Sequence, residues 1–272
     1  WVVRPLAQLS ADVERAAGGE LAVTPVRTRA GEVADIGAAL SGMADGLRAA
    51  LTARDVADQQ RRFLVTSIAH DLRTPLFTLR GSLEALELGI GAGDHLQRAQ
   101  DKATLLDGLV DDLFTYSRIE YATPELDRAA IDAVALAREA AGTVDGRIAV
   151  TAPAGGVTAF GDRGALLRVL INLADNAIRH ARSRVELAVT ADADATTFTV
   201  TDDGPGIHPD DVPHLFEPLF RADRTRNSAT GGAGLGLAIV DRLSAAQGAT
   251  VTVGAAPGGG AQFAVRCPHA AA

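Results

Sequence analysis

Residues 67–76 read Ser67-Ile68-Ala69-His70-Asp71-Leu72-Arg73-Thr74-Pro75-Leu76. The segment around them carries an apolar stripe at helical spacing, which consists of Leu64, Ile68, Leu72, Leu76, Leu79, Leu83 and Leu86. On a helix, His70 lies about 175° from the centre of this stripe, so we expect its imidazole to face solvent. Pro75 removes one backbone hydrogen bond and is expected to bend the helix locally.

An exposed imidazole beside a carboxylate has the components of an activated nucleophile. Asp71 can orient the His70 ring and accept its proton, which leaves the other ring nitrogen free to attack. Thr74 follows one turn later on the same side of the helix. A solvated surface histidine is the alternative, and the His-Asp pair alone does not exclude it.

A second helix is predicted after the glycine-rich break at 88–93, with Asp94 as its cap. Its apolar positions alternate spacings of three and four, as in a heptad seam: Leu96, Ala99, Ala103, Leu106, Val110 and Leu113. Two such helices joined as a hairpin predict a four-helix bundle made from two chains.

Residues 1–50 predict two short amphipathic helices around a glycine-rich connector. Pro5 suits a first helical turn, and Gly18-Gly19 ends that helix. A second stripe consists of Val33, Ile36, Leu40, Met43 and Leu47. Because two short helices cannot bury their stripes alone, a partner chain is implied.

The chain begins with Trp1 rather than Met, which suggests a piece of a longer protein. Trp1-Val2-Val3 followed by Arg4 suits the cytoplasmic end of a membrane helix, and an arbitrary boundary explains this start equally well. The sequence itself has no run of about 18 uncharged apolar residues.

Composition excludes several classes of function. The 272 residues are 47% hydrophobic and 22% charged, which is a soluble globular composition with room for more than one core. A net charge of −8 and an aromatic content of 4% argue against direct nucleic-acid binding. The single cysteine, Cys267, excludes a disulfide framework and a cysteine-based zinc site.

Residues 127–272 change to the alternating pattern of half-buried strands. The alternating segments are 184–189, 197–201, 250–253 and 262–265. Helical patterns interrupt them at about 131–144, 162–181 and 235–247. The combination predicts a mixed sheet with helices on one face, an α/β sandwich.

Two asparagines interrupt the otherwise apolar helix that starts at Asp162. Asn172 and Asn176 are four residues apart, and Arg179 and His180 continue the same side. Amide oxygens suit a hard cation such as Mg²⁺ together with phosphate. A polar outer helix face explains the pair equally well at this stage.

Two glycine-rich turns follow. Asp202-Asp203-Gly204-Pro205-Gly206 ends a strand and would let a base approach the backbone, although such a sequence is as often an ordinary turn. The run 231–236 leads into an apolar helix, a junction that binds phosphate through free N–H groups. It is not a P-loop, because Leu237 stands where the lysine would be, and it does not fit G-x-G-x-x-G.

Between these turns lies a segment rich in arginine and phenylalanine, with Phe216, Phe220, Arg221, Arg224 and Arg226. It is interpreted as a lid over the phosphate loop, or alternatively as a solvated charged loop.

Taken together, these motifs resemble those of bacterial sensor histidine kinases, in the family's order and over nearly the whole chain. Ser67–Leu76 is similar to the H box and Asn172–Ala181 to the N box. The G1, F and G2 boxes correspond to Asp202–Gly206, Phe216–Phe220 and Gly232–Leu237. Residues 1–50 are similar to a HAMP linker through Arg4-Pro5-Leu6, Gly31-Glu32-Val33 and Ala38–Met43.

The resemblance implies an α+β multidomain fold. Residues 1–52 would be a HAMP linker of parallel helices. Residues 53–122 would be the dimerisation and histidine phosphotransfer hairpin, which forms a dimeric antiparallel four-helix bundle. Residues 123–272 would be the catalytic ATP-binding domain, an α/β sandwich of the GHKL (Bergerat-like) type.

The resemblance also assigns roles. His70 would accept the phosphoryl group, and Asp71 (Glu in many members) would be the base that orients His70. Thr74 would position water for dephosphorylation of a partner. ATP and Mg²⁺ are the implied cofactors, with Asn176 as the metal ligand. The nucleotide-binding positions would be Asn172, Asn176, Arg179, Asp202, Gly204, Gly206, Phe220 (Tyr in the family), Arg221, Gly232, Gly234, Leu235 and Gly236.

The implied function is ATP-dependent autophosphorylation of His70, transfer to an aspartate of a response-regulator receiver domain, and also dephosphorylation of that regulator. The implied protein is a homodimer without direct nucleic-acid binding, the cytoplasmic portion of a membrane protein attached through segments absent from this sequence. Two other classes are weighed: an ATPase of the same nucleotide-binding fold, as in type II topoisomerases, mismatch-repair proteins or chaperones, and a catalytically inactive dimeric adaptor.

Overall fold

The computed structural model of this chain describes residues 31–121, 126–144, 148–221 and 234–269, together with positions 7, 10, 11 and 15. The expected membrane-proximal start and much of the HAMP-like region therefore lie outside the described residues. Of the expected first short helix, only positions 7, 10, 11 and 15 are described, and they are helical. The contacts divide the chain into two compact units, Trp1–Thr66 and Ser67–Ala272. No helix within the described ranges is both long and apolar enough to cross a membrane.

Helix α2 runs from Gly31 to Glu87 and has 57 residues. The sequence predicted two separate helices over this stretch, and the structure instead joins them into one. The joining segment 48–63 contains neither glycine nor proline, so nothing in it interrupts helical hydrogen bonding. The helix also continues through Pro75.

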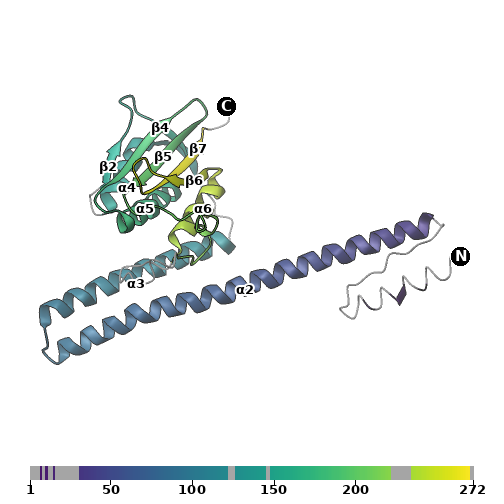
Figure 1. The fold of residues 1–272 in the computed structure, drawn as a ribbon, viewed down its shortest axis with the longest axis horizontal. Helices are drawn as coiled ribbons and strands as arrows, with labels where there is room; N and C mark the ends of the chain where they lie inside the picture. The colour runs from purple at the N-terminus through teal and green to yellow at the C-terminus, as the bar shows by residue number, and fades with distance from the viewer. Residues whose placement is uncertain are drawn as a thin grey trace. The chain divides into compact units, whose positions relative to one another are not determined.

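Helix α3 runs antiparallel to α2 after a short turn and spans Ala92–Tyr121 (Figure 1). Gly89 and Gly91 adopt positive φ angles of 72° and 54°, the left-handed conformation that glycine allows at a tight reversal. The predicted glycine-rich break is therefore confirmed, but the prediction that Asp94 caps the second helix is wrong, because α3 already begins at Ala92 and Asp94 lies in its first turn.

The apolar stripes of this hairpin are only partly covered within one chain. Ile68 and Ala99 are buried, whereas Leu76, Leu83 and Leu96 remain about half exposed. An exposed apolar seam of this kind calls for a second covering surface.

The remaining elements, from residue 128 onward, form the part of the chain that contains the β-sheets (Figure 1). In chain order they are β1 (Arg128–Asp132), α4 (Ala133–Thr143), β2 (Ile148–Thr151), β3 (Thr158–Asp162), α5 (Arg163–His180), β4 (Val185–Ala191), β5 (Ala195–Asp202), the 3-10 helix η1 (Val212–His214), α6 (Gly236–Gln247), β6 (Thr250–Ala255) and β7 (Ala261–Pro268). All three helices and four strands predicted from the pattern are present. The short strands β1, β2 and β3 were not predicted, because their Ala- and Gly-rich sequences alternate only weakly.

The main sheet has the strand order β2-β4-β5-β7-β6. Strands β2 and β4 are parallel and every other neighbouring pair is antiparallel, so the predicted mixed sheet is confirmed. Strands β1 and β3 form a separate two-stranded sheet. In β5 and β7 every second side chain is buried, among them Phe198 and Phe263, and α5 contacts β5 across this core.

Helix α5 begins at a capped turn that also anchors its neighbours. The Asp162 Oδ1 atom accepts from the Ala165 N–H at 2.8 Å, and Oδ2 accepts from the Asp127 N–H at 2.9 Å. The Asp162 N–H donates to Gln247 Oε1 at 2.8 Å, which ties the end of α6 to the same point. This contact holds α6 against α5, and Gly236, at the other end of α6, comes beside Asn172 in the middle of α5.

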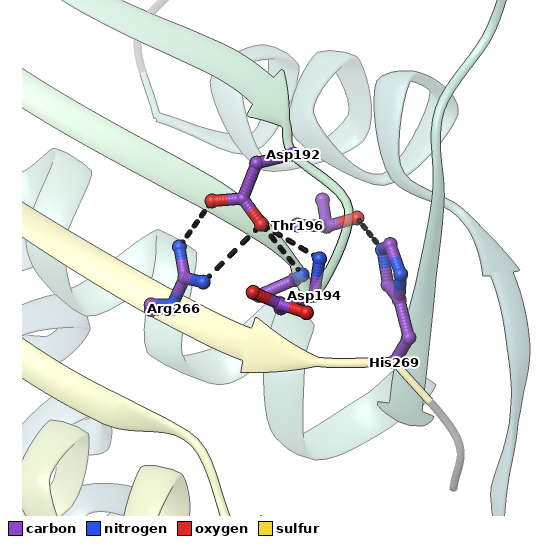
Figure 2. A network of polar contacts seen from close by, with 6 residues as sticks. Asp192, Asp194, Thr196, Arg266 and His269 are labelled. Atoms are coloured by element: carbon purple, nitrogen blue, oxygen red, sulfur yellow. Dashed lines mark hydrogen bonds and ion pairs between the residues drawn. The ribbon is translucent and has the colours of Figure 1, made fainter.

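A polar network closes the β4–β5 turn against the last strand (Figure 2). The Arg266 guanidinium contacts both oxygens of Asp192, at 2.5 and 3.2 Å. The Asp192 Oδ1 atom also accepts from the Asp194 and Ala195 N–H groups, each at 2.9 Å. These contacts, led by the Arg266 hydrogen bond, hold the pKa of Asp192 well below its usual range.

We expect Asp192→Asn to lower the free energy of unfolding more at neutral pH than in acid. A depressed carboxyl pKa stabilises the fold above the unfolded value of about 4, and this stabilisation is lost as pH falls through the folded value. Urea unfolding at pH 7 and at pH 3 measures both regimes. The gap between parent and variant should narrow at pH 3, and a gap that stays constant with pH would contradict the assignment.

Candidate functional site

His70 is presented to solvent on α2. Its side chain is 77% exposed, and its Nδ1 atom lies 3.5 Å from Asp71 Oδ1. The Thr74 hydroxyl donates to the His70 carbonyl at 3.5 Å, a long contact typical of an exposed helical threonine. The geometry agrees with the outward-facing imidazole expected from the pattern and places the three H-box residues on one stretch of helix.

Helix α5 separates its apolar and polar sides clearly. Leu166, Leu170 and Leu173 are fully buried in the core. The opposite side carries both asparagines, and there Arg179 pairs with Asp175 at 2.5 Å. The Asn172 Nδ2 atom is buried and has no hydrogen-bond partner among the residues that the structure describes. An unsatisfied buried donor is unfavourable, so this amide calls for an acceptor that the described part of the chain does not supply.

The N-terminus of α6 lies beside this unsatisfied amide. A Cβ added to Gly236 would be 3.8 Å from Asn172 Oδ1, which brings together two motifs that are distant in sequence. Leu235, at the helix cap, is buried and makes no side-chain capping hydrogen bond. The first N–H groups of a helix without a side-chain cap attract anions, and the Asn172 donor strengthens that preference. A phosphate group fits this position.

Asp202 lies at the end of β5 and is only 4% exposed. Its Oδ1 atom accepts from the Gly204 N–H at 2.8 Å and from the Ala261 N–H at 3.2 Å. The other oxygen has no hydrogen-bond partner among the described residues. A buried carboxylate oxygen with spare capacity is suited to accept from an exocyclic amino group of a ligand.

Gly204 must be glycine because the chain passes close to α5. A Cβ at this position would lie 2.4 Å from the His180 carbonyl oxygen. The neighbouring Asp203 accepts from the Arg182 N–H and from both the N–H and the hydroxyl of Ser183. These hydrogen bonds, with the Ser183 hydroxyl first, hold the pKa of Asp203 well below its usual range. The G1-like turn is thus fixed against the end of α5.

The F-like segment meets the G2-like glycines through the backbone. Leu219 has a positive φ of 65°, which is strained for a branched residue, and its N–H donates to the Gly234 carbonyl at 3.0 Å. A Cβ on Gly234 would be 2.9 Å from Leu219 backbone atoms. The Phe220 ring packs 5.7 Å from the His214 ring. Arg221 follows directly, whereas Gly232 and the other two arginines of the expected lid lie outside the described residues.

Gly260 is a site residue that the sequence reasoning missed. Its φ is +93°, and a Cβ there would lie 2.0 Å from the Asp202 carbonyl oxygen. The close approach lets the next residue, Ala261, donate its N–H to the Asp202 side chain. The run Gly258-Gly259-Gly260 was the available signal, because three consecutive glycines before a strand indicate unusual backbone angles.

We expect Gly260→Ala to destabilise the protein by about 3 kcal/mol or more, because steric overlap adds to backbone strain. Nucleotide affinity should fall with it as Asp202 moves. Gly258→Ala is the matched control, since its φ is similar, +94°, but its added Cβ meets nothing within 4 Å. Thermal unfolding of both variants separates the cost of backbone strain, which both share, from the cost of steric overlap, which only Gly260→Ala has. Equal losses of stability in the two variants would contradict the close-approach argument.

The residues present fit a nucleoside triphosphate. Asp202 offers an acceptor for a base, and Asn172 with the α6 N-terminus offers donors for phosphates. The expected binding residues Asn172, Leu235 and Gly236 come together, as do Asp202 and Gly204. His70 lies on a different element from all of these. Within the part of the chain that the structure describes, no group of three His, Cys, Asp or Glu side chains is placed to hold a metal ion.

Comparison with known families assigns two parts of the chain. Residues 60–122 match the His Kinase A (phospho-acceptor) domain. Residues 161–271 match the Histidine kinase-, DNA gyrase B-, and HSP90-like ATPase family. The first match contains His70, and the second contains the Asn172 and Asp202 motifs.

Individual relatives agree with both matches. The chain is 35% identical over 243 residues to Sensor protein RstB of Escherichia coli, covering 86% of this chain and 53% of RstB. It is 31% identical over 256 residues to Sensor histidine kinase CpxA of the same species, covering 88% of this chain and 52% of CpxA. The chain thus spans about half the length of these relatives.

One solved structure, full-length ShkA in complex with AMPPNP, aligns with a TM-score of 0.56 at 33% identity. That alignment covers 76% of this chain and 45% of ShkA.

Proposed function

Because this chain belongs to the bacterial two-component sensor histidine kinases, we propose that it transfers the γ-phosphoryl group of ATP to His70 and then to an aspartate of a response regulator. The observation that carries the proposal is that one chain combines two features. A phospho-acceptor domain presents the exposed His70–Asp71 pair, and an ATPase-family domain holds the Asn172 amide, an unsatisfied hydrogen-bond donor that can bind phosphate.

Nucleotide binding is proposed to use the groups that the fold brings together. The free oxygen of Asp202 accepts from the adenine amino group, and Asn172 and the α6 N-terminus donate to the phosphates. The AMPPNP complex of ShkA supports the binding of a nucleotide. Further proposed contacts to the nucleotide are Arg179, Phe220, Arg221 and Gly232. The backbone around the nucleotide is proposed to be shaped by Gly206, Gly234 and Leu235.

Asn176 is proposed as the protein ligand of Mg²⁺, through its amide oxygen. When bound, Mg²⁺ supplies neutralisation of phosphate charge. Asn176 follows Asn172 by one helical turn, which supports a place beside the same phosphates.

The proposed transfer step uses the two nitrogens of His70 differently. With Nδ1 facing Asp71, the Nδ1–H points at the carboxylate and the Nε2 lone pair is available. Nε2 forms the bond to the γ-phosphorus while the bond to the β–γ bridging oxygen breaks and ADP leaves. Asp71 takes the Nδ1 proton as the ring gains positive charge. Alignment and charge neutralisation provide most of the rate.

The second half of the proposal concerns the partners. The half-exposed seam of Leu76, Leu83 and Leu96 supports a homodimer whose hairpins form a four-helix bundle. Phosphohistidine then transfers its phosphoryl group to a receiver aspartate. In a separate reaction, Thr74 positions the water that hydrolyses the phosphorylated aspartate of the regulator. We further propose the domain boundaries 1–52, 53–122 and 123–272, and attachment to a membrane with these residues on the cytoplasmic side.

The two other classes are less well supported. An ATPase of the gyrase or chaperone type shares the 161–271 match, but the phospho-acceptor match over 60–122 favours a kinase. An inactive adaptor would not require the unsatisfied Asn172 donor or the free Asp202 oxygen.

The proposal is tested by incubating the chain with γ-labelled ATP and Mg²⁺ and then adding purified receiver domains. We expect label that is stable in base and labile in acid, as phosphohistidine chemistry requires, followed by transfer to one preferred receiver. A chain that binds nucleotide but never acquires acid-labile label would contradict it.

A further inference from the structure

One side of α3 carries two acidic residues and is partly covered by other helices. Asp112, Tyr116 and Glu120 follow one another at intervals of four residues, so they share a helix face. Asp112 Oδ1 lies 2.6 Å from Arg168 Nη2 of α5, and Glu120 Oε2 lies 3.2 Å from Arg242 Nη2 of α6. Tyr116, between them, is only 6% exposed, whereas Phe114 on another side of α3 is 66% exposed. This face therefore binds two helices, α5 and α6, of the proposed ATP-binding domain 123–272, which we call the ATP module.

The Asp112–Arg168 pair lies in a partly desolvated place. The two side chains are 24% and 33% exposed, so water screens their attraction less than at an open surface. Burial raises the pKa of Asp112, against the opposing effect of Arg168 and, more weakly, of Arg179. The Arg168 guanidinium also has spare capacity, because its Nε atom is buried and has no hydrogen-bond partner in the described ranges. An ion pair that is partly desolvated and incompletely hydrogen-bonded holds the two helices together, but other partners can compete for the Arg168 guanidinium.

The paired face of α5 is also its proposed nucleotide face. Arg168 precedes Asn172 by one helical turn, and Arg179 and Asp175, which both influence Asp112, flank Asn176. The ATP module is thus docked on α3 with this face turned towards the hairpin. Among the described residues, the His70 ring makes a polar contact only with Asp71, on α2.

We propose that the Asp112–Arg168 and Glu120–Arg242 ion pairs form a clasp that holds the ATP module on α3 in an arrangement that leaves His70 exposed, and that this clasp must open before phosphoryl transfer. The inference rests on the proposed kinase function and adds a regulatory contact to it. An arrangement with the clasp closed and one with ATP at His70 are alternative states, so weakening the clasp shifts the population towards transfer.

The first test measures autophosphorylation rates at saturating ATP. Asp112→Asn removes one charge from the hairpin and leaves every residue of the ATP module intact, so we expect the rate to rise about 5-fold. The control is Asp111→Asn, an exposed neighbour without a described partner, which should stay within about twofold of the parent. A rate that falls in Asp112→Asn alone would show that the contact belongs to the active state and would overturn the proposal.

Charge reversal separates the ion pair from general damage to the helix. Asp112→Arg places two guanidinium groups together and should raise the rate further. Combining it with Arg168→Asp restores an ion pair with the opposite orientation and should return the rate towards the parent value. A double variant as fast as Asp112→Arg would contradict a direct pairing.

A second test locks the clasp without relying on rates alone. Glu120→Cys with Arg242→Cys can be bridged by a short bifunctional maleimide, and background is low because the only native cysteine, Cys267, is 1% exposed. The bridged chain should keep its affinity for a fluorescent ATP analogue and lose His70 labelling. Failure to bridge, or full labelling after bridging, would overturn the clasp. Absence of labelling in the unbridged parent would instead contradict the kinase function.

Discussion

Replacing His70 with glutamine is expected to reduce acid-labile label from γ-labelled ATP at least about a thousandfold, to background. Glutamine occupies a similar volume and remains polar, but its amide nitrogen has no lone pair available for attack. Since the His70 side chain is 77% exposed, the substitution should leave folding intact. Label is measured on the purified chain after electrophoresis, and folding by circular dichroism.

His269→Gln is the matched control for this experiment. His269 is also exposed and follows β7, and among the described residues its ring makes a polar contact only with Thr196, at 3.3 Å (Figure 2). It should retain both labelling and nucleotide affinity. Persistence of label at the parent rate in the His70 variant would show that another residue accepts the phosphoryl group, and the proposed acceptor would be wrong.

Replacing Asp202 with asparagine is expected to weaken ATP binding about 100-fold, which corresponds to about 2.7 kcal/mol. The carboxylate is buried, accepts from two backbone N–H groups and keeps one oxygen for the ligand. An amide at this position presents an N–H₂ group either to those backbone donors or to the adenine amino group. In both orientations two donors face one another, and a buried hydrogen bond is lost.

Titration with a fluorescent ATP analogue measures this effect, with thermal unfolding as the check on folding. Asp194→Asn is the control, because it removes one carboxylate charge from the exposed β4–β5 turn without touching the Asp202 environment. Its affinity should match the parent. If Asp202→Asn bound the analogue as tightly as the parent, the adenine assignment would be wrong.

Helical periodicity predicted much of the fold because it is a local property of the chain. The outward direction of His70 followed from the positions of the leucines around it, and the polar side of α5 followed from the spacing of Asn172 and Asn176. The junction between the second short helix and the helix that carries His70 was predicted wrongly, since glycine and proline are absent from 48–63 and no local signal stops the helix. The short strands escaped prediction because alanine and glycine carry little alternation.

The sequence alone therefore determined the helices, the mixed sheet and the residue types at the proposed site, since each depends on neighbours within a few positions. Only the tertiary structure decided which of these residues meet. Gly236 lies beside Asn172, Gly260 presses against Asp202, and Asp112 pairs with Arg168, and each contact joins segments far apart in the chain. The physical reason is that such contacts depend on how whole elements pack around a shared core, which no local periodicity specifies.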